Sequence, residues 1–109
     1  MTLGELIKIL EATGYPVAYS HFIATPGKPV PAPPYICILV DGSSNLMADN
    51  KVYHKIDDAN IELYTTKKDL GAEAKLEKVL DDYEIPYDSY GTFIESEKMY
   101  QKIYETRLI

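Results

Sequence analysis

Residues 26–41 read PGKPVPAPPYICILVD, in which five prolines lead directly into an almost unbroken apolar run. From Tyr35 to Asp41 both alternating sets of positions are apolar, which is typical of a strand covered on both faces. We therefore expect residues 35–40 to form the central strand of the core. Proline fixes φ and favours the extended polyproline conformation. The segment before the strand is accordingly predicted to be a stiff loop over about residues 24–34.

A helix and a strand are predicted on the N-terminal side of this stretch. Residues 3–10 carry leucine and isoleucine at helical spacing, behind a capping box formed by Thr2 and Glu5. Gly14 and Pro16 are stop signals that end the helix. The next residues, VAYSHFI at 17–23, alternate as a strand does.

On the C-terminal side the pattern changes from strand to helix and back. Residues 46–50 are expected to be an irregular connection, and residues 51–65 to be two strands or one strand broken near residues 57–60. A second helix is predicted over about residues 67–83, stopped by Pro86. Strands follow over residues 85–89, 92–95 and 99–108. The last strand mixes charged and aromatic residues on both faces, which favours an edge or an intersubunit position.

These elements predict one domain over residues 1–109, because a chain of this length rarely forms two cores. The order is α-β-β-β(β)-α-β-β. It indicates an α+β fold in which a mostly antiparallel sheet of about five strands packs with two helices.

Composition argues against several classes of partner. The net charge is −6, from 17 acidic and 11 basic residues, and no run rich in lysine or arginine is present. Direct binding of nucleic acid is therefore not expected, while a basic surface on a partner protein suits this charge. The longest apolar run is much shorter than the ~20 residues that span a bilayer. Without a secretory leader pattern at its start, the chain is expected to be made and kept in the cytoplasm.

The residues that most often carry chemistry do not assemble into a site in the sequence. Cys37 is the only cysteine and lies in the apolar run, so it is predicted to be a small buried hydrophobe. His21 and His54 lie in strand patterns without metal or catalytic spacing and are expected to be partly buried. Asp57-Asp58 is assigned to a turn, and Asp81-Asp82 to a solvated helix end. We expect no enzyme activity, cofactor, metal or small-molecule substrate. An enzyme that uses Asp57, Asp58, His54 or Cys37 is the least favoured alternative.

Tyrosines and prolines are the stronger signal. The chain has ten tyrosines and no tryptophan, and tyrosine is enriched at interfaces, although an outer sheet face can use it for strand propensity alone. The PxxP spacings at residues 26–29 and 31–34 allow a docking motif, although a braced loop explains them too. The candidate protein-interaction residues are Pro26, Pro29, Pro31, Pro33, Pro34, Tyr53, Tyr64, Tyr100 and Tyr104.

The order of these segments resembles a family of small proteins from tailed-bacteriophage and prophage operons. The stretches that carry it are PPYICILVD, MADNKVYHKID, NIELYTTKKD, AEAKLEKVLDDY and IPYDSYGTFIESEKMYQKIYE, from Pro33 to the end of the chain. Within them the most specific pieces are residues 33–35, 48–50, 61–65 and 97–104. The family comprises head–tail joining, tail-completion and tail-terminator proteins.

This resemblance implies a structural virion protein without catalytic residues. Such proteins assemble into a ring, often a hexamer, that caps the tail tube and meets the head connector. The protein would be made in the bacterial host cytoplasm and end at the head–tail junction, with the proline segment, residues 26–34, crossing a subunit boundary. Terminator and connector roles both remain open. The alternative is a small cytoplasmic adaptor or regulatory domain that binds a host protein through the same segment.

Overall fold

The computed structural model describes residues 1–24, 26–27, 29–43, 45–48 and 50–108; at Asp41, 46–48 and 52–54 it describes the backbone only. The elements in chain order are α1 (Leu3–Glu11), β1 (Val17–Tyr19), β2 (Tyr35–Ser43), β3 (Leu46–Ala48), β4 (Lys51–His54), β5 (Asp57–Thr65), α2 (Leu70–Asp82), β6 (Asp88–Ile94) and β7 (Met99–Leu108).

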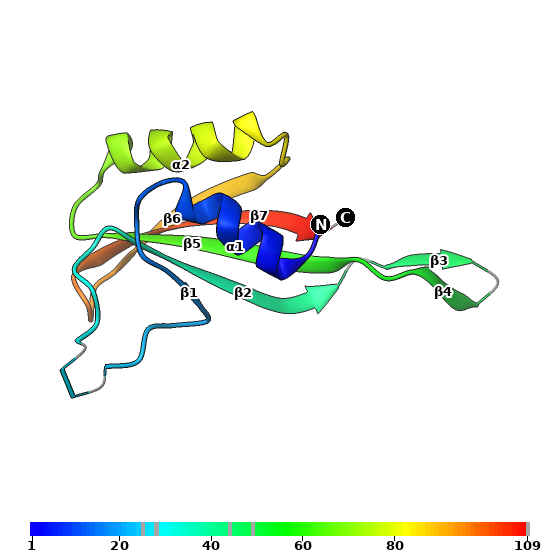
Figure 1. The fold of residues 1–109 in the computed structure, drawn as a ribbon, viewed down its shortest axis with the longest axis horizontal. Helices are drawn as coiled ribbons and strands as arrows, with labels where there is room; N and C mark the ends of the chain where they lie inside the picture. Colours follow the sequence, from blue (N-terminus) through cyan, green and yellow to red (C-terminus); the bar gives the residue numbers. More distant parts are fainter. Residues whose placement is uncertain (25, 28, 44, 49, 109) are drawn as a thin grey trace.

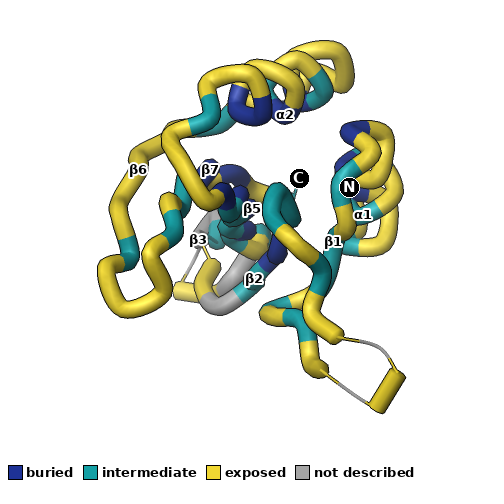
Figure 2. The backbone as a smooth tube through the Cα atoms, turned by 90° about the vertical axis from the view of Figure 1, so that its left-hand side faces the viewer, coloured by how far each residue is buried: buried dark blue, intermediate teal, exposed yellow. Residues whose placement is uncertain are grey.

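Five strands form one sheet in the order β1-β2-β5-β7-β6, and β3 pairs with β4 in a separate two-stranded sheet. Only the β1–β2 pairing is parallel; the other pairings are antiparallel. Both helices lie on one face of the large sheet (Figure 1); in the view along the strands α2 lies above them and α1 lies beside β1 (Figure 2). The predicted α+β fold with a mostly antiparallel sheet is therefore confirmed.

The core lies between the helices and the sheet. From Asp58 to Thr65, strand β5 alternates between half-buried and buried residues, because one of its faces packs against the helices. Each helix adds an apolar stripe at helical spacing. The buried core residues include Leu6, Leu10, Ile36, Ile38, Ala59, Ile61, Leu63, Ala72, Leu76 and Leu80.

Both helices begin at a side chain that caps the backbone. The Thr2 hydroxyl oxygen accepts a hydrogen bond from the Glu5 amide at 3.1 Å, as the capping pattern predicts. The carboxylate of Asp69 accepts one from the Ala72 amide at 3.0 Å, so α2 begins at Leu70 and not near residue 67. Its charge also suits the positive end of the helix.

Two strand assignments were wrong in position. The predicted central strand, β2, lies second in the sheet; β5 is central and pairs with β2 on one side and β7 on the other. The last strand, β7, is not at an edge, because β6 returns antiparallel along it from Asp88 to Ile94. The apolar character of β2 instead reflects cover on both faces, since Ile36, Cys37 and Ile38 are all buried.

Three loop and strand assignments also differ from the sequence prediction. The strand expected over residues 17–23 ends at Tyr19, because Ser20 adopts a positive φ of 65° and its amide donates to the Ile38 carbonyl. Residues 46–48, predicted to be irregular, form β3 and pair with β4. The strand over residues 51–65 is interrupted, as one alternative had it, but Asp57-Asp58 opens β5 and is not a turn.

The buried position of Cys37 makes its thiol unreactive. Burial, and secondarily the nearby Glu62 carboxylate, raise the pKa of Cys37 to about 11. We expect a disulfide reagent at about pH 8 to label the native thiol at least about a hundredfold more slowly than in concentrated urea, because thiolate is the reacting form. A rapid native reaction would contradict this; Thr92→Cys in a Cys37→Ser background, exposed on β6, is the matched fast control.

The same shift has a consequence for stability. The folded state holds the thiol neutral while the unfolded chain ionises near its ordinary pKa of about 8.5. The contribution of Cys37 is therefore complete below that pH and is lost as pH rises towards about 11. Comparing Cys37→Ser with the unmodified chain by urea unfolding across this range isolates the effect.

Candidate functional site

A hairpin leaves the body of the molecule between two strands that already pair. Ser43, at the end of β2, is the register partner of Asp57, at the start of β5. A two-residue turn would be enough to join such a pair. Instead the chain inserts the 13 residues 44–56, which contain β3 and β4. We call residues 44–56 the arm.

The arm extends past the end of the sheet, away from both helices (Figure 1). Among the described elements, the substantial contacts of β3 are with β4 alone. The radius of gyration is 15.2 Å, whereas a compact domain of this size has about 13 Å. The arm thus lengthens the molecule and contributes little to its core.

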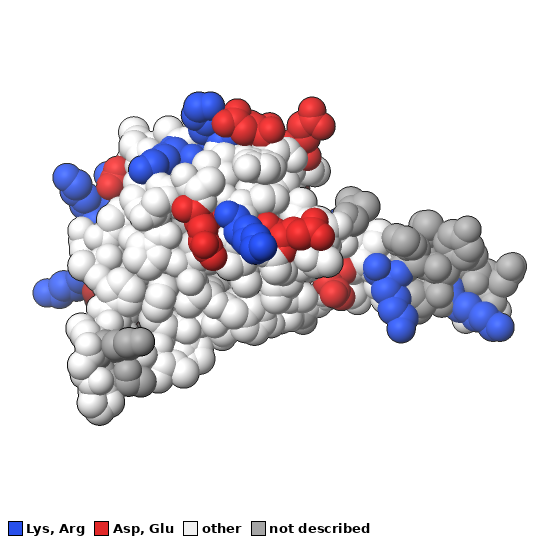
Figure 3. Space-filling model, in the orientation of Figure 1, with Lys and Arg blue, Asp and Glu red and all other residues white. Residues whose placement is uncertain are grey.

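An isolated two-stranded hairpin is marginally stable in water. The base of the arm is fastened by a hydrogen bond of 3.0 Å from the Ile56 amide to the Asn45 side-chain oxygen. Beyond this base the exposed cations Lys51 and Lys55 extend from it, and Figure 3 shows basic atoms on this projection. Contact with a second molecule would therefore stabilise this hairpin.

The strand β6 is a free edge of the sheet. Its residues are exposed except for the half-buried Ile94, and its aromatic side chains Tyr90 and Phe93 are 50% and 47% exposed. Edge strands are usually protected by proline, by several charges or by a bulge. In β6 there is no proline, one charged residue, Asp88, and continuous pairing with β7. This edge can accept a further strand.

The sheet face opposite the helices carries an aromatic cluster near the start of β2. Tyr35 stacks on Tyr64 with ring centroids 5.2 Å apart, and Phe22 meets Tyr35 edge-on at 5.3 Å. The Tyr64 hydroxyl donates to Glu62 at 3.1 Å and accepts from the Gln101 amide at 3.0 Å. Burial and the Glu62 carboxylate raise the pKa of Tyr64. Tyr64 is thus half-buried, and its hydroxyl is already hydrogen-bonded within its own subunit.

The other predicted tyrosines do not share one surface. Tyr104 is fully buried, and its hydroxyl donates to the Glu77 carboxylate at 2.9 Å, so its assignment to an interface was wrong. Tyr104 faces the helices because it lies opposite Ile61, on the core alternation of the sheet. Tyr100 is 36% exposed and packs on Phe93. The side chain of Tyr53 lies outside the described part of the chain.

The proline segment runs as a loop into β2. Pro26 and Pro29 are exposed, whereas Pro31, Pro33 and Pro34 are half-buried. The two halves therefore differ: the second braces the entrance to the sheet, and the first is accessible to another molecule.

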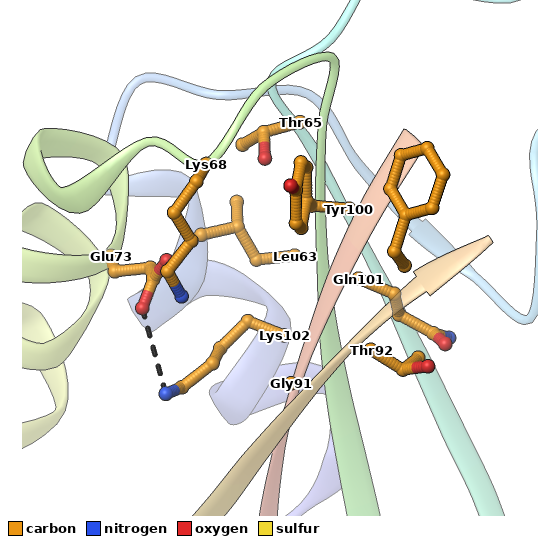
Figure 4. A pocket seen from close by; sticks show the side chains of 10 residues that line it. Leu63, Thr65, Lys68, Glu73, Gly91, Thr92, Tyr100, Gln101 and Lys102 are labelled. Carbon is orange, nitrogen blue, oxygen red and sulfur yellow. Dashed lines mark ion pairs between the residues drawn. The ribbon is translucent and has the colours of Figure 1, made fainter. Parts of the chain in front are cut away.

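A pocket of about 360 Å³ lies on the helix side between the first turn of α2 and strands β6 and β7. In Figure 4 the Glu73 carboxylate lies between two lysines, with Lys68 at 2.8 Å and Lys102 at 3.5 Å. Only 8% of Glu73 is exposed, so the ion pairs offset the cost of burying its charge. They tie α2 to β7. The Glu73 side of the pocket is therefore a structural junction.

Sequence reasoning missed both the arm and this junction. The junction joins Glu73 to Lys102 across 29 residues, and no local pattern indicates such a pair. The first half of the arm was predicted to be an irregular polar connection. Only the alternation in residues 51–54 indicated a strand, in the second half. His21, expected to be partly buried, is exposed and contacts the Ser20 hydroxyl at 3.1 Å. The side chain of His54 is not described.

Within the described ranges no three histidine, cysteine or acidic residues gather as metal ligands, and no helix has the length and apolarity needed to cross a bilayer. The chain matches no protein-family model and no curated protein. The resemblance to phage head–tail proteins therefore stays a prediction from the sequence. The arm and the free edge of β6 are the features to which a function can be attached.

Proposed function

We propose that the protein is a structural subunit of the head–tail junction of a tailed bacteriophage or prophage, a tail terminator or tail-completion protein. It acts by assembling into a ring and docking to tail-tube and connector proteins. The observation that carries the proposal is the arm, which is inserted where a two-residue turn suffices and whose described strands, β3 and β4, make their substantial contacts only with each other.

Ring assembly is supported by two different candidate interaction surfaces on one chain, the arm and the β6 edge. The arm projects from one end of the molecule, while β6 runs along an edge of the sheet beside α2 (Figure 1). When two different surfaces meet between identical subunits the contact is head-to-tail, and such contacts close into a ring when the rotation between neighbouring subunits closes. The sequence resemblance supplies the virion context, and the absence of a recognised catalytic pattern in the sequence agrees with a structural role.

Assembly is the first expected outcome. Purified protein should form a species of one defined multiple of its 12.3 kDa mass by light scattering, and negative-stain images should show rings. Mixed with tube protein encoded beside its gene, it should bind tube ends and stop their elongation. A protein that stays monomeric and binds neither tube nor connector protein would refute the proposal. A mutant without the arm is the matched control.

The adaptor alternative is favoured by one observation, the exposure of Pro26 and Pro29. If a host protein docks on the proline segment, Pro26→Ala with Pro29→Ala should lower its recovery in a pull-down. Pro31→Ala and Pro34→Ala test the second PxxP spacing but also loosen a half-buried brace. Equal recovery with the double variant and with both single variants would remove this alternative.

A further inference from the structure

We propose that the arm of one copy adds to the free β6 edge of a second copy and extends its sheet. The inference rests on the proposed ring, because it names the two surfaces through which neighbouring subunits would meet. The occupant of the edge is a second copy of this chain, and the segment that occupies it is residues 44–56.

Of the two edges of the large sheet, the β6 edge is better suited to accept an added strand. At the opposite edge, β1 has only three residues, and α1 packs against it. Strand β6 offers seven residues, and its pairing with β7 continues from Asp88 to Ile94. Strand addition uses the backbone groups that an edge strand leaves unpaired. The β6 edge therefore has room for the three or four residues of β3 or β4.

The arm has the conformation that such an edge requires. Its strands β3 and β4 are already paired with each other, and a two-stranded sheet has two outer edges. Joining one of them to β6 would convert a marginal hairpin into part of a larger sheet. The Asn45–Ile56 hydrogen bond already fastens the base of the arm, which lowers the conformational entropy lost when the arm binds.

Charge complementarity selects this partner. Lys51 and Lys55 are exposed on the arm. At the beginning of the receiving strand, Asp88 lies directly opposite Glu105 of β7, and like charges in that position are destabilising. Figure 3 shows further acidic atoms at the C-terminal end of α2, where Asp81 and Asp82 lie. Cations from a neighbouring arm would relieve the repulsion at Asp88.

Charge reversal tests the contact. Lys51→Glu with Lys55→Glu, and separately Asp88→Lys with Glu105→Lys, should each raise the protein concentration for half-assembly at least about tenfold at low salt. The four substitutions together should restore assembly, because the charges are complementary again. Lys8→Glu with Lys67→Glu, exposed elsewhere and of equal charge change, should assemble like the unmodified protein. Added salt should reduce the differences in half-assembly concentration among these proteins, because it screens the charges.

Hydrogen exchange locates the contact independently of charge. Amides in residues 88–94 and in β3 and β4 should be protected at assembling concentrations and exchange faster on dilution. If a lysine variant at β6 fails to fold, Asp88→Asn with Glu105→Gln removes the same charges and should also weaken assembly. Unchanged assembly in all charge variants, no restoration in the fourfold variant, or no change in exchange at β6 would each overturn the inference.

The outcomes separate this inference from the proposed function. If every arm and edge variant still forms rings that cap tail tubes, the arm–edge contact is refuted and the proposed function stands. A monomer at all concentrations removes the arm–edge contact as well, and binding to tube or connector protein then decides the proposed function on its own.

Discussion

Tyr104→Ala is expected to lower the free energy of unfolding by about 3–5 kcal/mol, a large part of the stability of a small domain. Tyr104 is fully buried in the core, and its ring meets Tyr87 edge-on with centroids 5.3 Å apart. Truncation removes that packing, leaves a cavity and takes the donor from Glu77. Urea denaturation followed by circular dichroism measures the loss.

Two companion variants show which part of Tyr104 matters. Tyr104→Phe keeps the ring and should cost about 1–2 kcal/mol, because only the hydrogen bond to the half-buried Glu77 is lost. Tyr100→Ala, on the same strand but partly exposed, should cost clearly less than Tyr104→Ala. If Tyr104→Ala instead left the stability unchanged and weakened assembly, the original interface assignment would be correct and the buried one wrong.

Replacing residues 44–56 by Asn-Gly is expected to abolish assembly and leave the fold intact. Ser43 and Asp57 are already register partners, so a two-residue turn of the kind that Asn-Gly favours should join β2 directly to β5. The core between the helices and the sheet includes no described residue of the arm. Light scattering should report a monomer, while circular dichroism and the melting temperature stay close to those of the unmodified protein.

A flexible replacement distinguishes the ordered hairpin from mere chain length. Thirteen glycine and serine residues in place of 44–56 should also give a monomer, because they supply neither strand nor lysine. Rings of unchanged mass from either variant would show that the arm is not the assembling surface. Loss of the folded spectrum would show that the arm does contribute to the body, contrary to its few contacts there.

Local patterns predicted the elements well where one physical signal dominated. The Thr2 capping box located the start of α1, and the alternation over residues 61–65 corresponds to the buried face of β5. Strand β7 was harder. Tyr100, Lys102 and Tyr104 share one alternation, and the lysine among them disguised a face that packs towards the helices. Only the tertiary contact with Glu73, far away in sequence, accommodates that cation.

The sequence by itself determined the α+β class, the two helices and the apolar, proline-braced strand at residues 35–40. These follow from periodicity, capping and the stiffness of proline, which act between residues close in the chain. The tertiary structure decided which strand is central, which tyrosines are buried and that residues 44–56 project as an arm. Strand order depends on pairing across tens of residues, and a side chain is buried only when another element covers it. No local pattern in the sequence tells which distant element supplies that pairing or that cover.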